Sequence, residues 1–198
     1  MAPTITRFYM DRAQIAELIG LTDTKSVRQM ETSRRLLSPD VIVGDEDEQG
    51  RVSMGWDEKR VREFFTARGR LDEQGRPVVG QKPGKPPKGD EEMEFMARWT
   101  SIPARYLGNR QVCRRLGISD ASLHTRRDEG NFPQPDVVIG RAETVIIDGQ
   151  EVPTTKTKRG VVPGWSDERI GRFGLQEGLI VVVDGKQWPA SQLKRGGV

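Results

Sequence analysis

The chain has 198 residues, a formal net charge of +3 and 34% hydrophobic residues, enough for one or two small cores. It contains no run of about 20 apolar residues that could cross a bilayer, and its first residues lack the apolar segment of a secretory signal. Its one cysteine, Cys113, cannot form an internal disulfide, which fits a reducing compartment. We therefore expect a cytoplasmic protein. The excess of basic residues lies in the C-terminal half, which suits a polyanionic partner.

Two parts of the chain repeat the same pattern of residues in the same order. The matching stretches are 9–23 with 106–120, 39–44 with 135–140, and 55–56 with 164–165. A collinear match of this length, with shared apolar positions, predicts an internal duplication. The alternative is that two unrelated helical segments share an amphipathic pattern. The recurring Pro-Asp and Gly-Trp pairs argue against that alternative.

The most informative stretch, residues 109–135, lies in the second repeat. Its apolar residues at positions 112, 113 and 116 fall on one face of a short helix. Gly117 is suited to end this helix, and Ser119 to cap the next one with its hydroxyl group. The second helix, residues 120–129, has Leu123 as its one strongly apolar residue and is expected to face something polar. The pattern is that of a helix-turn-helix.

Each repeat then continues into a β-branched run that predicts a short strand and a hairpin. The strands are expected at residues 41–44 and 137–140, and a hairpin turn at Asp148-Gly149 precedes a longer arm through residues 153–164. A Gly-Trp pair opens a third helix, expected over residues 57–67 and 167–173, with Gly171, Gly174 and Gly178 marking its end in the second repeat. Helix, turn, helix, hairpin and helix follow one another as in a winged helix-turn-helix.

The expected fold class is α+β, mainly α, with two tandem winged helix-turn-helix domains joined by a Pro/Gly/Lys-rich linker. Residues 1–75 form the first domain, and residues 105–198 form the second together with a C-terminal hairpin. Residues 76–104 form the linker, because the prolines and glycines between positions 78 and 90 cannot sustain a regular hydrogen-bonded element. A short helix over residues 91–99, capped by Asp90, is expected at its end.

The second repeat resembles the MerR-like winged-helix superfamily, and within it the excisionase and prophage-regulator branch. The resemblance is carried by V-C-R-R-L-G-I-S at 112–119, E-G-N-F-P-Q-P at 129–135, V-V-I-G at 137–140 and G-W at 164–165. It implies sequence-specific binding of double-stranded DNA, with the second helix in the major groove and the wing against the backbone or minor groove. The first repeat departs from the branch at Leu36-Leu37, where the branch has Phe-Pro, and the second at Arg126, where it usually has an apolar residue.

A DNA-reading helix needs small polar side chains near its start and long cations further along. In the second repeat, the predicted DNA-binding residues are Ser119, Ser122, Thr125, Arg126 and Arg127 on the helix and Lys156, Lys158 and Arg159 on the wing. In the first repeat, they are Thr22, Thr24, Lys25, Arg28 and Gln29, with Arg34 and Arg35 after the helix. Any one of these arginines could equally be a merely solvated residue. Their grouping where the fold would meet DNA favours the functional interpretation.

The wing of the first repeat differs in charge, since residues 45–48 read Asp-Glu-Asp-Glu. Phosphate groups would repel four carboxylates, so this wing points away from DNA or the first repeat serves another purpose. We favour docking of the first repeat by its helix alone. The alternative is that this repeat is a surface for protein contacts.

The sequence does not predict an enzyme, a cofactor or a metal site. His124 has no companion histidine and is expected to be a partly buried helix residue, and Cys113 is expected to fill the core face of its helix. No glycine loop of the phosphate-binding type is present.

We therefore expect a regulatory or architectural DNA-binding protein of a bacteriophage, plasmid or other mobile element. It is either a transcription regulator or an excisionase-like recombination directionality factor, and it works with the transcription machinery or an integrase. One chain is expected to act as its own dimer. The alternative is an adaptor in which the second repeat binds DNA and the first binds a protein.

Overall fold

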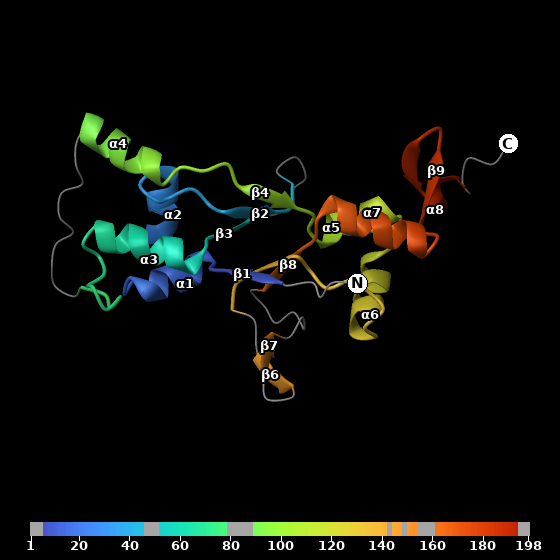
Figure 1. The fold of residues 1–198 in the computed structure, drawn as a ribbon, viewed down its shortest axis with the longest axis horizontal. Helices are drawn as coiled ribbons and strands as arrows, with labels where there is room; N and C mark the ends of the chain where they lie inside the picture. The colour runs from blue at the N-terminus through green and yellow to red at the C-terminus, as the bar shows by residue number, and fades with distance from the viewer. Residues whose placement is uncertain are drawn as a thin grey trace.

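The computed structural model describes residues 6–45, 52–78, 89–141, 144–147, 150–153 and 161–193. It is an α+β structure in which short helices flank small sheets (Figure 1). The helices are α1 (Arg12–Leu18), α2 (Lys25–Thr32), α3 (Glu58–Ala67), α4 (Asp90–Arg98), α5 (Asn109–Leu116), α6 (Asp120–Asp128), α7 (Asp167–Gln176) and α8 (Ala190–Leu193). None of these described helices is long and apolar enough to cross a membrane.

The strands are short, and within the described residues they make two three-stranded sheets and two two-stranded sheets. They are β1 (Arg7–Tyr9), β2 (Val41–Val43), β3 (Ser53–Gly55), β4 (Ala104–Tyr106), β5 (Val137–Ile139), β6 (Thr144–Ile147), β7 (Gln150–Pro153), β8 (Val162–Gly164), β9 (Ile180–Val183) and β10 (Lys186–Pro189). The predicted strands at 41–44 and 137–140 are confirmed as β2 and β5. β6 and β7 pair antiparallel, as expected of a hairpin, while the predicted turn residues Asp148 and Gly149 lie outside the described residues; the antiparallel partner of β5 is β8.

The two repeats form the same local contacts at equivalent residues. The indole Nε1 of Trp56 donates to the Leu37 carbonyl at 3.1 Å, and that of Trp165 donates to the Pro133 carbonyl at 2.9 Å. Both tryptophan side chains are fully buried, so each indole N–H needs such an acceptor. Each tryptophan therefore fixes the third helix of its repeat against the segment that follows the second helix.

An ion pair also recurs in both repeats. It joins the aspartate just before β2 or β5 to an arginine on the third helix. Asp40 lies 2.7 Å from Arg60 in the first repeat, and Asp136 lies 2.8 Å from Arg169 in the second. Both pairs are about three-quarters shielded from solvent, and each carboxylate also accepts a backbone N–H at the start of the third helix. These shared contacts support the internal duplication.

Each repeat gives its first strand to the sheet of the other repeat. β1 of the first repeat pairs in parallel with β5 of the second, with Tyr9 opposite Ile139. β4, which begins the second repeat, pairs in parallel with β2 of the first, with Tyr106 opposite Val43. The two sheets are therefore β1-β5-β8 and β3-β2-β4. In Figure 1 these strands lie between the two groups of helices.

The exchanged sheets pack against each other through small and β-branched residues. Their buried cluster comprises Val41, Val43, Val137 and Ile139. Gly55 and Gly164 make this contact close, because a Cβ on Gly55 would lie 2.8 Å from Tyr9 Cβ and one on Gly164 would lie 2.7 Å from a Val43 methyl group. The repeats therefore contact each other directly, in addition to being joined by the connecting segment.

The helices of each repeat enclose a separate core, built around Trp56 in the first repeat and Trp165 in the second. The expected helix of the connecting segment is confirmed as α4, although Gly89 occupies its N-cap and Asp90 is its first residue. Phe95, Met96 and Trp99 pack against the core of the first repeat. α4 and β4 therefore both contact the first repeat.

The third helix of the second repeat is longer than predicted. Gly171 and Gly174 lie inside α7, which ends with Gln176 and is followed by Gly178 at φ 65°. Gly174 is needed for packing, because a Cβ there would lie 2.6 Å from the Ile180 side chain. The prediction that the first two glycines end the helix was wrong, because both lie inside α7 and Gly174 serves close packing and not chain reversal.

The predicted C-terminal hairpin is confirmed as β9 paired with β10, with both Asp184 and Gly185 at positive φ in its turn. The hairpin supports the tight turn between α5 and α6. It places Pro189 beside Gly117, where a Cβ on the glycine would be 2.8 Å from Pro189 Cβ. In the first repeat Pro77 lies beside Gly20 in the same way, since a Cβ on Gly20 would be 3.2 Å from Pro77 Cβ.

Candidate nucleic-acid interface

The second helix of the first repeat, α2, is held by its N-terminus and by one buried residue. The Asp23 carboxylate accepts hydrogen bonds from the backbone N–H groups of Lys25, at 2.7 Å, and Ser26, at 3.2 Å, and so caps the helix. Val27 is completely buried. With Val27 in the core and Met30 packed against it, the remaining face of α2 is free to carry polar side chains.

The residues predicted to bind DNA lie on this outer side. Exposed positions in and next to α2 are Thr22, Thr24, Lys25, Arg28, Gln29, Arg34 and Arg35. The four cations form no ion pair with any other described residue. Arg34 takes a left-handed conformation, with φ 56°, and ends the helix. The structure therefore groups all seven predicted residues of the first repeat around one helix.

A groove of ≈ 770 Å³ runs beside the N-terminal half of α2. Thr24, Lys25 and Arg28 line it on one side, while Ile139 and Val162 of the second repeat contribute to its wall. The strand exchange brings these two residues to the first repeat, and sequence reasoning therefore did not find them. The groove carries three cations from the first repeat, Arg12, Lys25 and Arg28, and apolar contacts from the second.

One of these three cations has a structural role. Arg12 on α1 lies 2.7 Å from the Glu31 carboxylate and 5.8 Å from the Trp56 ring centroid. The hydrogen bond to Glu31 raises the pKa of Arg12, so the guanidinium stays charged. Glu31 neutralises Arg12 locally, and the basic character of the groove therefore comes from Lys25 and Arg28.

The second helix of the second repeat, α6, begins as predicted. Gly117 ends α5 at φ 66°, and the Ser119 hydroxyl accepts from the Ser122 N–H at 3.1 Å. Thr125 is exposed, and its hydroxyl donates to the Ala121 carbonyl at 3.1 Å. The caps of the predicted helix-turn-helix are therefore present in this repeat.

The outer face of α6 differs in charge from that of α2. Its exposed ionisable residues include Asp120, His124, Asp128 and Glu129. His124 Nε2 lies 3.5 Å from the Asp120 carboxylate, and its side chain is 47% exposed. The prediction that His124 is partly buried was wrong, because Leu123 alone fills the core position and the next residue along the helix points outward.

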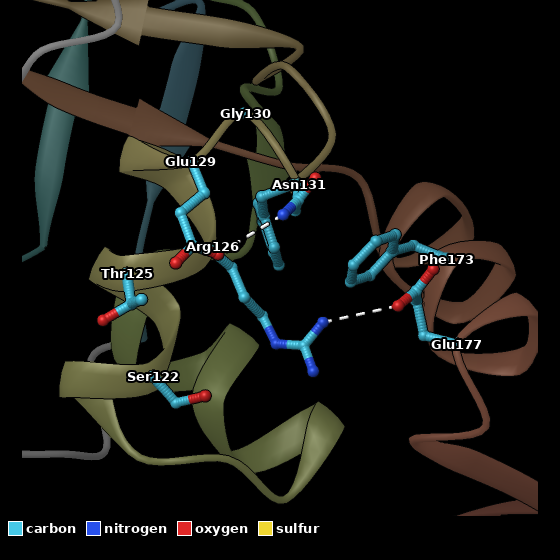
Figure 2. Close-up of a pocket in the computed structure, with 9 residues that line it drawn as sticks. Ser122, Thr125, Arg126, Glu129, Gly130, Asn131, Phe173 and Glu177 are labelled. Carbon is cyan, nitrogen blue, oxygen red and sulfur yellow. Dashed lines mark hydrogen bonds and ion pairs between the residues drawn. The ribbon is translucent and has the colours of Figure 1, made fainter.

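The two arginines predicted to read DNA are half-buried. Arg126 extends across to α7, where its guanidinium lies 3.4 Å from the Glu177 carboxylate (Figure 2). The Arg127 guanidinium lies over the Trp165 ring at 5.4 Å from its centroid, and burial lowers its pKa. These contacts give both side chains a role within the second repeat.

A second groove, between α6 and α7, was not predicted. Ser122, Thr125 and Arg126 line one side, and Phe173 and Glu177 line the other (Figure 2). Three predicted DNA-binding residues therefore meet at this groove. A sequence signal for this groove is the difference between Met30 in the first repeat and the aligned Arg126 in the second. Met30 packs on the core, so a cation at the aligned position indicates a different surface there.

Two groups of predicted residues fall wholly or mainly outside the described part of the chain. Lys156, Lys158 and Arg159 of the second wing do so, as do residues 46–48 of the acidic stretch in the first. Within the described residues, no three His, Cys, Asp or Glu side chains gather in a way that could hold a metal ion. Cys113 is half-buried against the second core, and burial raises the pKa of its thiol.

Comparison with known proteins found no matching family model, no matching curated protein and no matching solved structure.

Proposed function

We propose that this protein binds double-stranded DNA in a sequence-specific manner through two tandem winged helix-turn-helix units. In each unit the second helix, α2 or α6, would be the recognition helix. The observation that carries the proposal is the set of exposed cations at α2: Lys25, Arg28, Arg34 and Arg35, none of which pairs with another described residue. Exposed cations around a helix, next to exposed threonines, fit phosphate contacts beside base contacts.

The charges make α2 the stronger candidate for the main DNA contact. Carboxylates on the exposed face of α6 would be repelled by phosphates, whereas α2 has an exposed face rich in Lys and Arg. The biological role we propose is regulatory or architectural: a cytoplasmic transcription regulator or excisionase-like factor of a bacteriophage or mobile element. An integrase or the transcription machinery would be its protein partner.

A second candidate function is an adaptor with the two roles divided between the repeats. Asp120, Asp128 and Glu129 on the exposed face of α6 favour a version in which the first repeat binds DNA and the second binds a protein. This is the reverse of the division expected from sequence. It also accounts for the use of Arg126 and Arg127 inside the second repeat.

The test uses the full chain. A preferred site is first selected from a pool of random labelled DNA, and the affinity for that site is then measured. Replacing Lys25 and Arg28 with Ala should weaken binding by about 1 to 3 kcal/mol per contact and lower the slope of log affinity against log salt by about 1 to 2. The matched control replaces Lys59 and Arg62, two cations on α3 that pair with glutamates, and should leave the affinity nearly unchanged. Absence of binding to every member of the pool would refute the proposal.

A further inference from the structure

The groove between α6 and α7 has an equivalent in the first repeat, and that equivalent is filled. In the aligned repeats Phe64 corresponds to Phe173, Arg68 to Glu177 and Met30 to Arg126. In the first repeat α4 packs at this place. Phe64 is fully buried there, whereas Phe173 is only half-buried beside the open groove of the second repeat.

The contacts of α4 define what the filled groove recognises. Phe95 and Trp99 of α4 lie against Phe64, with ring centroids 5.9 Å and 5.5 Å away. Glu92 lies 3.7 Å from Arg68, and the Arg68 guanidinium lies 5.1 Å from the Phe64 ring centroid. An amphipathic helix is therefore bound by aromatic packing on α3 and by one ion pair.

The end of α4 is fixed by hydrogen bonds to its last carbonyl group. Ser38 donates to the Trp99 carbonyl from its backbone N–H at 3.2 Å and from its hydroxyl at 3.1 Å. The equivalent residue in the second repeat is Gln134, which is exposed and has a side-chain amide that can donate hydrogen bonds. The second repeat therefore has groups to meet both the aromatic face and the C-terminus of a helix.

We propose that the groove between α6 and α7 binds an amphipathic α-helix of a partner protein, with an aromatic residue against Phe173 and a basic residue opposite Glu177. The charge follows from the exchange of Arg68 for Glu177, since a helix that carried an acid at the position of Glu92 would meet a carboxylate. Glu177 also pairs with Arg126, and its carboxylate has lone pairs for a second cation. This proposal does not depend on DNA binding.

The probes are two synthetic peptides of residues 89–100 of this chain, one with the natural sequence and one, the charge-reversed peptide, with Glu92→Lys. The charge-reversed peptide should bind the full-length protein, and Glu177→Arg in the protein should weaken that binding about tenfold. The same substitution in the protein should make the natural peptide the tighter ligand. Because the Glu177 side chain is about half exposed, this variant is expected to fold. Phe173→Ala should weaken both peptides fivefold or more through the lost ring contact.

A crosslinking group at the Phe95 position of the peptide locates the site. Adducts on α6 or α7 support the proposal, and adducts on α3 would mean that the peptide displaces α4 from the first repeat. The proposal is refuted if the crosslinks map to α3, if neither peptide binds, or if Glu177→Arg leaves the order of the two affinities unchanged. Each outcome can be read whether or not the protein binds DNA.

Discussion

Gly55 on β3 lies so close to Tyr9 on β1 that a Cβ atom on Gly55 would be 2.8 Å from the Tyr9 Cβ. The same Cβ would also lie 2.8 Å from a methyl group of Val41. Neither neighbour is the flexible end of a side chain, since the Tyr9 contact is next to the backbone of an exchanged strand. The contact between the two sheets therefore depends on a glycine at this position.

The first prediction is that Gly55→Ala lowers the free energy of unfolding by about 1 to 3 kcal/mol, because the added methyl group overpacks the contact between the sheets. Urea unfolding followed by circular dichroism measures this change. The control is Gly108→Ala, where a Cβ would have ordinary contacts at 3.6 Å and would weaken an N-cap by less than about 1 kcal/mol. Equal effects of the two substitutions would contradict the close contact.

The second prediction concerns the exchanged strands. Residues 1–84 alone would lack β4 beside β2, and residues 85–198 alone would lack β1 beside β5, so the central strand of each sheet would become an edge strand. Neither fragment should show a fully dispersed NMR spectrum by itself. A mixture should form a one-to-one complex with the spectrum of the intact chain. Two fragments that each fold completely alone would show that the exchange is not needed.

The third prediction separates structural from DNA-binding arginines. Arg127→Ala should lower the free energy of unfolding by about 1 kcal/mol, because the half-buried guanidinium loses its contact with the Trp165 ring. Arg28→Ala should change stability by less than about 0.5 kcal/mol, since Arg28 is exposed. Urea unfolding of both variants, with DNA affinity measured on the same samples, checks this. If Arg127→Ala left stability unchanged and weakened DNA binding by about 1 to 3 kcal/mol, α6 would instead be a reading helix.

The fourth prediction is slow alkylation of Cys113. Burial, assisted by the charge of Asp120, raises the pKa of the thiol, so the folded protein holds less thiolate at pH 8 than a free cysteine does. The neutral thiol is favoured in the folded state, and its contribution to stability is lost as the pH rises through the raised pKa. The iodoacetamide rate against pH should be displaced to higher pH and should return to normal in urea. In the folded protein, Asp120→Asn should move the pH dependence of the alkylation rate part of the way back to lower pH.

The fifth prediction is that one chain protects about two turns of DNA, with α2 and α6 fixed relative to each other by the exchanged strands. Inserting ten Gly and Ser residues between positions 79 and 88 should then change the affinity less than twofold. If the connecting segment alone joined the repeats, a longer tether would lower the effective concentration and the affinity with it. Footprinting and titration of the inserted variant distinguish the two arrangements.

Local signals in the sequence predicted much of each repeat. The turn at Gly117, the cap at Ser119 and the strands β2 and β5 follow from residue types that adopt few other conformations. The pairing of β1 with β5 could not be predicted, because Arg7–Tyr9 is a three-residue strand without an alternating pattern and its partner is more than a hundred residues away.

The candidate site was predicted for α2 and only in part for α6. A pattern that counts every arginine as polar places Arg126 and Arg127 outside, although long side chains of this kind can lie over an aromatic ring or reach a carboxylate across a groove. The decisive partners, Trp165 and Glu177, come from segments that are distant in sequence. Only the folded arrangement brings them to α6.

The exchange of strands also sets the order in which a newly made chain can become complete. The Thr6 hydroxyl, next to β1, donates to the Pro135 carbonyl across a sequence separation of 129 residues, so β1 leaves the ribosome long before its partner β5 has been made. The first repeat in turn stays open at β2 until β4 has been synthesised. Interrupted translation would therefore release a product with an uncovered strand edge, which is suited to recognition by chaperones and proteases.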